Sequence, residues 1–357
     1  MPLDWSKLQP HQALGPGDPR YVESPEGTSK TLSDWVDAGR NTLLLAGPVG
    51  SGKSTELARA VQRSTSTIRC LLPIDRRENL RTLTGNKLLA TMAILAVEAG
   101  KADGLPISPS VEGVWAERAR LEHASRESKA GDALLEACRE VSRLAGKPVT
   151  FFLDGLEKAE PTVVSKALRA LASVPDEVGL VVVVPLTDVY GQRTELIRPG
   201  ERIVTHGPVV GPMAYRFFGE LLARRLSQSW QALTVIEAFS VENLVHQLQT
   251  FSSGLPRDFL QLAADAATYA RLNRGGEWPD DSDLTAARAD FIESFRRALQ
   301  PGDVAALRQV DGTDGRELEL GRKLRLLTQG MLVETTDSPG IKLMRPHNLV
   351  RPLLGNV

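Results

Sequence analysis

The residues with the clearest chemistry form a glycine-rich loop at positions 47–54, where Gly-Pro-Val-Gly-Ser-Gly-Lys-Ser fits the pattern G-x-x-x-x-G-K-[ST]. Glycines let the backbone turn its N–H groups inward around an anion, and the N-terminus of a following helix favours the same anion. In such a loop Lys53 reaches the β- and γ-phosphates of a nucleoside triphosphate, and the Ser54 hydroxyl coordinates Mg²⁺. The predicted phosphate-binding residues are therefore Gly47, Pro48, Val49, Gly50, Ser51, Gly52, Lys53, Ser54 and Thr55.

Flanking segments place this loop between a strand and a helix. The apolar run 42–46 predicts a buried strand, and residues 55–62 predict a helix. This order is the one that the pattern requires, and it disfavours an ordinary Gly/Ser-rich loop before an unrelated helix. Apolar runs separated by helical segments are typical of a parallel sheet that is covered on both faces. We therefore predict an α/β fold with a five-stranded parallel sheet, with strands at 42–46, 68–74, 149–153, 180–184 and 203–209.

A second acidic site follows the apolar strand of VTFFLDGLEK, residues 149–158. Asp154 ends this strand and is expected to hold Mg²⁺ opposite Ser54, the alternative being an ordinary strand-end cap. Glu157 could polarise a water for hydrolysis of the γ-phosphate, or it could be a surface glutamate paired with Lys158.

Composition limits the possible classes of protein. The chain has 357 residues, a formal net charge of −1, 42% hydrophobic and 24% charged residues, which describes an ordinary globular protein of two or three compact parts. This charge gives no overall attraction to nucleic acid or acidic membranes. Its two cysteines, Cys70 and Cys138, are far apart, so we expect neither a disulfide framework nor a zinc site. No apolar stretch long enough to span a bilayer and no secretion signal is evident, and we expect a cytoplasmic protein.

The pattern of apolar and polar residues changes at three points along the chain. Residues 1–30 form an irregular leader, 31–211 the P-loop core, 212–275 a helical lid, and 283–357 a last compact part. That last part has three helical runs followed by two strand-like pieces around a turn. Three helices and a hairpin are the layout of a winged helix.

GPVGSGKST together with FFLDGLE resembles the STAND branch of P-loop ATPases, which are relatives of AAA+ and origin-recognition ATPases. The resemblance extends over roughly residues 30–357 and implies a P-loop NTPase fold with a helical lid, a C-terminal winged-helix domain, and ATP and Mg²⁺ as ligands. Many AAA+ enzymes have a glutamate directly after the metal-binding aspartate. This chain has Gly155 there, so rapid hydrolysis is not expected.

Two later residues match functional positions of these families. In SSGLPRDFLQLA, residues 252–263, Arg257 stands where AAA+ relatives have an arginine that senses the γ-phosphate, although an exposed arginine beside Asp258 is an equal alternative. In KLMRPHNLVRPLL, residues 342–354, His347 matches the histidine with which related switch ATPases hold the β-phosphate of ADP. A packing or capping histidine is the alternative, and Asn348 replaces the aspartate that follows it in eukaryotic members.

Further polar residues suggest weaker roles. Thr187 and Asp188 follow the fourth strand, where a polar side chain could test the γ-phosphate. An arginine finger that reaches a neighbouring subunit could come from Arg193, Arg198 or Arg202. Basic residues around the last helix could contact DNA, although packing of the winged helix on the core is the preferred interpretation; they are Arg316, Arg322, Lys323 and Arg325.

The sequence thus predicts a nucleotide-dependent switch that binds ATP, with weak ATPase activity at most. STAND proteins usually fuse an effector and a repeat sensor to this core; neither is evident, so we expect a protein effector or sensor in trans, with a homo-oligomer as a further possibility and bacterial defence or signalling as the context. One alternative is an origin-recognition or transposition-like ATPase that binds duplex DNA through the winged helix. Another is a self-contained NTPase or kinase, which the residue at position 155 disfavours. No guanine-specific motif is evident, so ATP is preferred to GTP.

Overall fold

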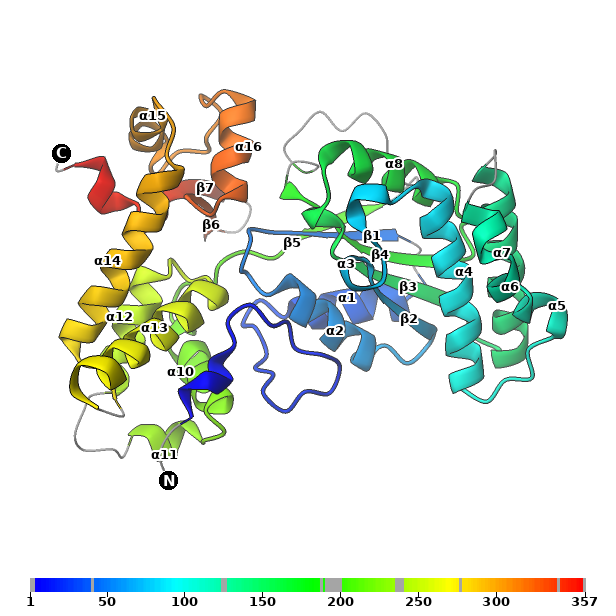
Figure 1. The fold of residues 1–357 in the computed structure, drawn as a ribbon, viewed down its shortest axis with the longest axis horizontal. Coiled ribbons are helices and arrows are strands. Elements are labelled where there is room, and N and C mark those ends of the chain that lie inside the picture. Colours follow the sequence, from blue (N-terminus) through cyan, green and yellow to red (C-terminus); the bar gives the residue numbers. More distant parts are fainter. Residues whose placement is uncertain are drawn as a thin grey trace. The chain divides into compact units, whose positions relative to one another are not determined.

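The structure is a computed structural model that describes residues 4–39, 42–122, 127–186, 189, 201–234, 241–275, 278–338 and 341–355. The chain forms two compact units, whose elements are labelled in Figure 1. The first, called the sheet unit, comprises Thr28–Ala46 and Glu56–Thr205. The second, called the helical unit, comprises Met1–Gly27, Gly47–Thr55 and His206–Val357. The glycine-rich loop therefore belongs to the helical unit by its contacts, although it directly follows a strand of the sheet unit.

The sheet unit is built on five parallel strands in the order β2-β3-β4-β1-β5. Every pair of neighbouring strands is parallel. Neighbours in the sheet are either joined by helical connections or are not consecutive in the sequence, as expected when crossover connections link the strands. Leu43 of β1 lies opposite Val181 of β4 on one side and Arg202 of β5 on the other. The strands are β1 (Thr42–Ala46), β2 (Ile68–Pro73), β3 (Val149–Asp154), β4 (Gly179–Val183) and β5 (Arg202–Thr205).

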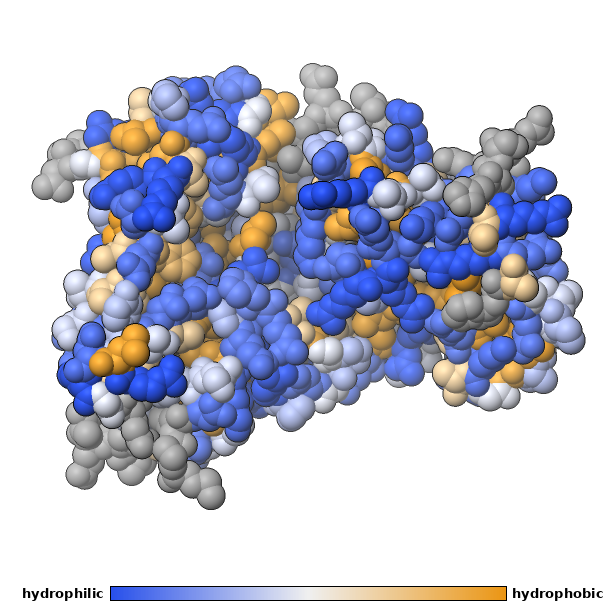
Figure 2. All heavy atoms as spheres, in the orientation of Figure 1, coloured by the Kyte–Doolittle hydropathy of each residue, from blue (hydrophilic) through white to orange (hydrophobic). Residues whose placement is uncertain are grey.

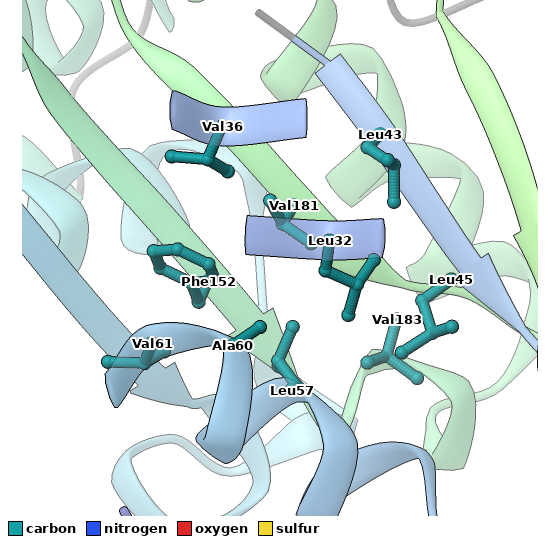
Figure 3. Close-up of a cluster of buried hydrophobic side chains, with 10 residues drawn as sticks. All are labelled: Leu32, Val36, Leu43, Leu45, Leu57, Ala60, Val61, Phe152, Val181 and Val183. Carbon is teal, nitrogen blue, oxygen red and sulfur yellow. The ribbon is translucent and has the colours of Figure 1, made fainter. Parts of the chain in front are cut away.

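Helices α1 and α2 cover one face of this sheet. Apolar side chains from both helices meet side chains from β1, β3 and β4 in a buried cluster (Figure 3). Leu32 and Phe152, from α1 and β3, are fully buried there. Side chains of a strand point alternately to the two faces of the sheet. Helix α4 contacts β2, and α7 contacts β3. The helices are α1 (Thr28–Asp37), α2 (Lys53–Arg63, whose first turn belongs to the helical unit), α3 (Ile74–Arg77), η2 (Leu80–Thr82), α4 (Gly85–Ala102), α5 (Pro109–Glu112), α6 (Val114–Glu122), α7 (Glu127–Ala145), η3 (Leu156–Lys158) and α8 (Pro161–Ala172).

The helical unit contains two consecutive segments after residue 206. The lid segment has α10 (Ala214–Arg225), α11 (Trp230–Thr234), α12 (Val241–Phe251) and α13 (Pro256–Arg274). The C-terminal segment has α14 (Asp281–Ala298), α15 (Asp303–Val310), α16 (Leu320–Thr328), the antiparallel hairpin β6 (Leu332–Ser338) and β7 (Ile341–Pro346), and η4 (Arg351–Leu354). Near the N-terminus lies η1 (Trp5–Leu8), which contacts α10 and α13.

Local sequence explains where the main helices of this unit begin and end. Pro256 occupies the first turn of α13, where no backbone N–H is needed, and Gly275 ends it in the left-handed conformation. Asp280 and Asp283 form a capping box at the start of α14, which satisfies two exposed N–H groups reciprocally. An isolated antiparallel β-bridge between Thr313 and Met344 adds a third chain segment beside β7 of the hairpin. The order of three helices and a hairpin is the one predicted for a winged helix.

The five-stranded parallel α/β fold is confirmed. The fifth strand is shorter than the predicted 203–209, and its pairing explains the difference. Thr205 is the last residue of β5 and lies opposite Ala46, the last residue of β1. Beyond that point β1 gives way to the glycine-rich loop, so residues 206–209 have no neighbouring strand to bond.

Hydrophilic residues make up most of the molecular face shown in Figure 2. Of the helices that the structure describes, none combines the length and apolarity that crossing a membrane requires.

Candidate phosphate-binding site

The loop at 47–54 can be formed only with glycine at three of its positions. A Cβ on Gly47 would lie 2.2 Å from the backbone oxygen of His206, closer than any real contact. Gly50 and Gly52 have φ angles of +87° and +104°, in the region that side chains other than glycine rarely adopt. The glycines of the motif are therefore explained by backbone geometry as well as by a requirement for close approach to a ligand.

Lys53 lies inside the loop that precedes it. Its Nζ donates hydrogen bonds of 2.9 Å to the backbone oxygens of Gly47 and Pro48, and the residue is only 7% exposed. Lys53 is also the first residue of α2, so the positive end of this helix and the ammonium group lie in one short segment. The loop thus concentrates positive charge where the motif predicts a phosphate.

His206 contacts the backbone of the glycine-rich loop, and no sequence motif predicted this role. Its Nε2 lies 2.9 Å from the backbone oxygen of Ser51, and its Nδ1 lies 3.3 Å from Oε2 of Glu26. The imidazole is buried at 1% exposure. In the sequence, His206 stands inside a segment predicted to be strand, which gave no reason to assign it a role.

The leader also contacts this region. The backbone N–H of Leu14 donates to Oγ1 of Thr55 at 3.3 Å. Arg224 and Arg225 of α10 donate to the backbone oxygens of Tyr21 and Leu8, so the leader is attached to the lid segment as well. Burial lowers the pKa of Arg225 to about 10.

Arg257 lies against the loop. Its backbone N–H donates to the backbone oxygen of Gly50 at 3.1 Å. A Cβ built on Gly50 would lie 3.0 Å from Cβ of Arg257 and 3.7 Å from Oδ1 of Asp258. The first turn of α13 therefore packs directly on the glycine-rich loop and brings Arg257, a sequence-predicted site residue, beside it.

His347 directly follows β7 and is fully buried. Its Nδ1 accepts a hydrogen bond of 3.2 Å from the backbone N–H of Leu349, so the other ring nitrogen carries the proton. That Nε2 lies 3.2 Å from the backbone oxygen of Ser252 and 3.2 Å from Oδ2 of Asp258. Asp258 therefore orients the ring, although the position after His347 holds asparagine.

This histidine joins the lid segment to the C-terminal segment. Its ring packs against Phe295 of α14, with centroids 5.2 Å apart. The next residue, Asn348, donates from its backbone N–H to Oγ of Ser253 at 2.7 Å and from its side chain to the oxygen of Thr250 at 2.6 Å. In this arrangement both ring nitrogens of His347 face protein atoms, which is the arrangement expected of a packing histidine.

In the sheet unit, Asp154 is the last residue of β3 and is half-buried. Parallel strands end at the same edge of a sheet, so Asp154 lies at the edge of the sheet where β1 also ends. Glu157 follows in the short helix η3 and is also half-buried.

Gly155 has a structural reason to be glycine. Its φ angle is +89°, and a Cβ there would lie 2.6 Å from Oδ1 of Asp75. Asp75 in turn forms an ion pair of 2.5 Å with Lys158. A glutamate at position 155, as in many AAA+ enzymes, would need a different backbone conformation and a displaced Asp75.

The basic residues around α16 mostly have partners inside the protein. Arg325 forms an ion pair with the fully buried Asp303, and Arg322 lies 3.6 Å from the same carboxylate. Lys323 is 8% exposed, and desolvation lowers its pKa. Arg316 pairs with Asp314 at 2.8 Å. Arg325 and Lys323 therefore contribute to the packing of the C-terminal segment, whereas the side chain of Arg316 is 88% exposed.

Several predicted residues are not brought into this site. Arg202 belongs to β5, and its guanidinium lies 5.6 Å from the ring centroid of Trp35. Thr187, Asp188, Arg193 and Arg198 lie outside the described residues.

No protein-family model and no curated protein matches the chain. Among solved structures, the chain is similar to Aeropyrum pernix Orc1 in complex with DNA, with 14% identity over 98% of this chain and 96% of the other, and a TM-score of 0.48. It is similar to the Thermotoga maritima RuvB Holliday junction branch migration motor, with 13% identity over 95% and 99% of the two chains and a TM-score of 0.44. It also matches a STAND protein with a tetratricopeptide repeat sensor from Pyrococcus horikoshii, with 14% identity over 93% of this chain and 42% of the other, and a TM-score of 0.39.

The strand order and the glycine-rich loop that follows β1 give this chain the P-loop NTPase fold that the sequence predicted.

Proposed function

We propose that this chain is a nucleotide-dependent switch that binds ATP with Mg²⁺ at the loop 47–54 and hydrolyses it slowly. The loop geometry supports phosphate binding, because its glycines, its buried lysine and the N-terminus of α2 are all held in one short segment. The Ser54 hydroxyl and Asp154 are the Mg²⁺ ligands of the proposal, and oxygen donors of this kind suit Mg²⁺. Bound Mg²⁺ would neutralise charge on the phosphate oxygens.

The observation that carries the switch is the link between Gly50 and the lid segment. The oxygen of Gly50 accepts the N–H of Arg257, the neighbouring Asp258 contacts His347, and His347 belongs to the C-terminal segment. A ligand that moves the backbone of Gly50 therefore acts directly on the first turn of α13. A ligand shifts a conformational equilibrium only by its differential affinity for the two states, and the γ-phosphate beside Arg257 supplies such a difference between ATP and ADP.

Slow hydrolysis is part of the same proposal. Glu157 is the candidate to polarise the attacking water. The position directly after Asp154 has no carboxylate, and the conformation of Gly155 and the proximity of Asp75 disfavour one there. Weak turnover suits a switch, because each nucleotide state then persists long enough to be read by a partner. We extend the proposal to a protein effector or sensor in trans, with a homo-oligomer as one form of assembly.

DNA binding through the C-terminal segment is the less favoured alternative. Phosphate contacts need cationic side chains that can release counterions. Around α16, Arg325 and Arg322 are directed at the buried Asp303, whereas Arg316 is 88% exposed. The observations thus favour a packing role for this segment.

Nucleotide binding by the Lys53→Ala variant tests the proposal. We expect the affinity for a fluorescent ATP analogue, measured by fluorescence anisotropy with Mg²⁺, to fall by about a hundredfold, because the ammonium makes charge-assisted hydrogen bonds to the phosphates. Lys166→Ala on the exposed face of α8 is the matched control and should bind like the parent. Equal affinity of the Lys53→Ala variant and the parent would refute phosphate binding at this loop.

The switch itself is tested by hydrogen exchange of the parent chain in ADP and in a non-hydrolysable ATP analogue. We expect the first turn of α13 and residues 347–349 to exchange at different rates in the two nucleotides. Identical exchange in both, with nucleotide shown to be bound, would refute the switch and leave nucleotide binding standing.

A further inference from the structure

His206 contacts the glycine-rich loop through both its backbone and its ring. A Cβ on Gly47 would come within 2.2 Å of the backbone oxygen of His206, so this residue lies directly against the start of the loop. Its ring atom Nε2 lies 2.9 Å from the backbone oxygen of Ser51 and 3.6 Å from the position of a Cβ on Gly52. One residue therefore bounds the loop at positions 47, 51 and 52.

The second partner of the ring, Glu26, is placed by a turn of the leader. The sequence Ser-Pro-Glu-Gly at 24–27 favours a β-turn, because proline suits the second position of such a turn and glycine the last. The backbone N–H of Gly27 donates to the backbone oxygen of Ser24 at 2.9 Å, as expected for this turn. Oε2 of Glu26 then lies 3.3 Å from Nδ1 of His206. Local sequence in the leader thus brings a carboxylate to the imidazole.

Both partners of the imidazole are hydrogen-bond acceptors. The backbone oxygen of Ser51 accepts only, and so does the carboxylate of Glu26. A neutral imidazole has one N–H and can donate to one of these oxygens, while its other nitrogen directs a lone pair at the second oxygen. An imidazolium has two N–H groups and donates to both. The geometry therefore matches the protonated form of His206.

Other charged groups of the helical unit come near this pair. Lys53 belongs to the same loop and bonds its backbone oxygens. The hairpin contributes Glu334, whose backbone oxygen lies 3.9 Å from the position of a Cβ on Gly207, and whose carboxylate pairs with Lys342 at 2.7 Å. The side chain of Glu26 is 40% exposed, so the pair reaches solvent on its carboxylate side and can exchange protons with it.

We propose that His206 is a positioning residue for nucleotide binding, an inference that rests on the proposed function of the glycine-rich loop. The imidazolium, oriented by Glu26, holds the oxygen of Ser51 and so keeps the loop in the conformation that receives phosphate. Loss of its proton removes one of the two hydrogen bonds, and the loop is then held less firmly. Binding that depends on a protonated group is strongest at low pH and weakens as the group loses its proton, so nucleotide affinity falls as the pH rises.

The variant Glu26→Gln tests this inference. The affinity for a fluorescent ATP analogue with Mg²⁺ is measured by anisotropy from about pH 5.5 to about pH 8.5, the range in which histidines titrate. Nucleotide phosphates titrate there too, so variant and parent are compared at each pH. Glutamine can donate to an unprotonated Nδ1, so a neutral ring satisfies both contacts. We expect the affinity of Glu26→Gln relative to the parent to rise about threefold to tenfold from the acidic to the alkaline end, because only the parent loses a charge-assisted hydrogen bond.

Variants of the histidine separate the hydrogen bond to Ser51 from the titration. Glutamine at position 206 can still donate to the oxygen of Ser51 but has no proton to lose in this range, so His206→Gln should follow the pH profile of Glu26→Gln. His206→Ala should bind nucleotide about tenfold more weakly than His206→Gln, because the oxygen of Ser51 loses its donor. His246→Gln removes an exposed histidine of α12 and is the matched control, which should keep the profile of the parent.

The outcomes distinguish this inference from the proposed function. A parent chain that binds no nucleotide at any pH would overturn both. A parent that binds nucleotide with the same pH profile as Glu26→Gln would overturn the positioning role of His206 and leave nucleotide binding standing. Because Glu26 is partly exposed and glutamine has the same shape, this comparison does not depend on the folding of the variants at the buried position 206.

Discussion

Replacement of His347 by alanine tests the junction between the lid segment and the C-terminal segment. The imidazole is fully buried and contacts Leu349, Ser252 and Asp258 through its two nitrogens. Its removal leaves the N–H of Leu349 buried without an acceptor, which costs roughly 1–3 kcal/mol. Loss of the ring contact with Phe295 adds about 0.5–1.5 kcal/mol. The side chain of Asp258 is 15% exposed and regains some hydration, so loss of its contact with His347 adds little to the free-energy cost. We expect the junction to be destabilised by roughly 2–4 kcal/mol.

Hydrogen exchange at the amide of Leu349 measures this cost locally. A loss of 2–4 kcal/mol corresponds to exchange that is faster by about thirtyfold to several hundredfold. His246→Ala is the matched control, because His246 is an exposed histidine on α12 whose backbone oxygen accepts the hydroxyl of Thr250. This control should change the exchange at Leu349 by less than about twofold.

Two conservative variants separate the roles of the ring nitrogens. Asparagine at position 347 can present an oxygen near the place of Nδ1 and should preserve part of the protection of Leu349. Glutamine reaches further and should preserve the contact with Asp258 while leaving the N–H of Leu349 without its acceptor. Protection of Leu349 that is unchanged in His347→Ala, or equal losses in the asparagine and glutamine variants, would refute this assignment of the hydrogen bonds.

Two further outcomes follow from local geometry. Gly155→Glu should destabilise the sheet unit by about 1–3 kcal/mol in chemical denaturation and should not raise ATP turnover, because its φ is +89° and Asp75 occupies the space. Gly146 also has a positive φ, but open space surrounds it, so Gly146→Ala should lower the stability less than Gly155→Glu. Equal losses of stability would exclude the clash with Asp75. Burial raises the pKa of the Cys70 and Cys138 thiols, so neither should react with a thiol reagent at pH 8 until denaturant is added. Rapid reaction of both thiols in the native chain would contradict their burial.

The sheet and the conformation of the glycine-rich loop could be predicted because their signals are local. Each strand is a short apolar run, and the loop is a pattern of eight consecutive residues in which backbone geometry requires glycine. The end of the fifth strand was missed because it depends on a partner. Thr205 pairs with Ala46, and the apolar residues after it look like strand although β1 no longer continues beside them.

The groups that hold the loop could not be predicted, since they come from distant parts of the chain. Glu26 and His206 are separated by 180 positions and meet only in the fold, at a distance of 3.3 Å. His206 resembles any histidine within an apolar run, and its role appears only when the oxygen of Ser51 is found 2.9 Å from its ring. A single sequence has no feature that associates these residues.

The contact between Asp258 and His347 was not expected from the sequence. The position after His347 has asparagine, which suggested that the ring lacked an orienting carboxylate. The carboxylate comes instead from the residue after Arg257, on the helix whose first turn bonds Gly50. One turn of α13 thus contacts both the glycine-rich loop and the histidine of the C-terminal segment. A helical turn is rigid, so a displacement at Gly50 that moves Arg257 must also change the environment of His347. This shared turn is why we expect the exchange of Leu349 to respond to the nucleotide at a loop almost three hundred positions earlier in the chain.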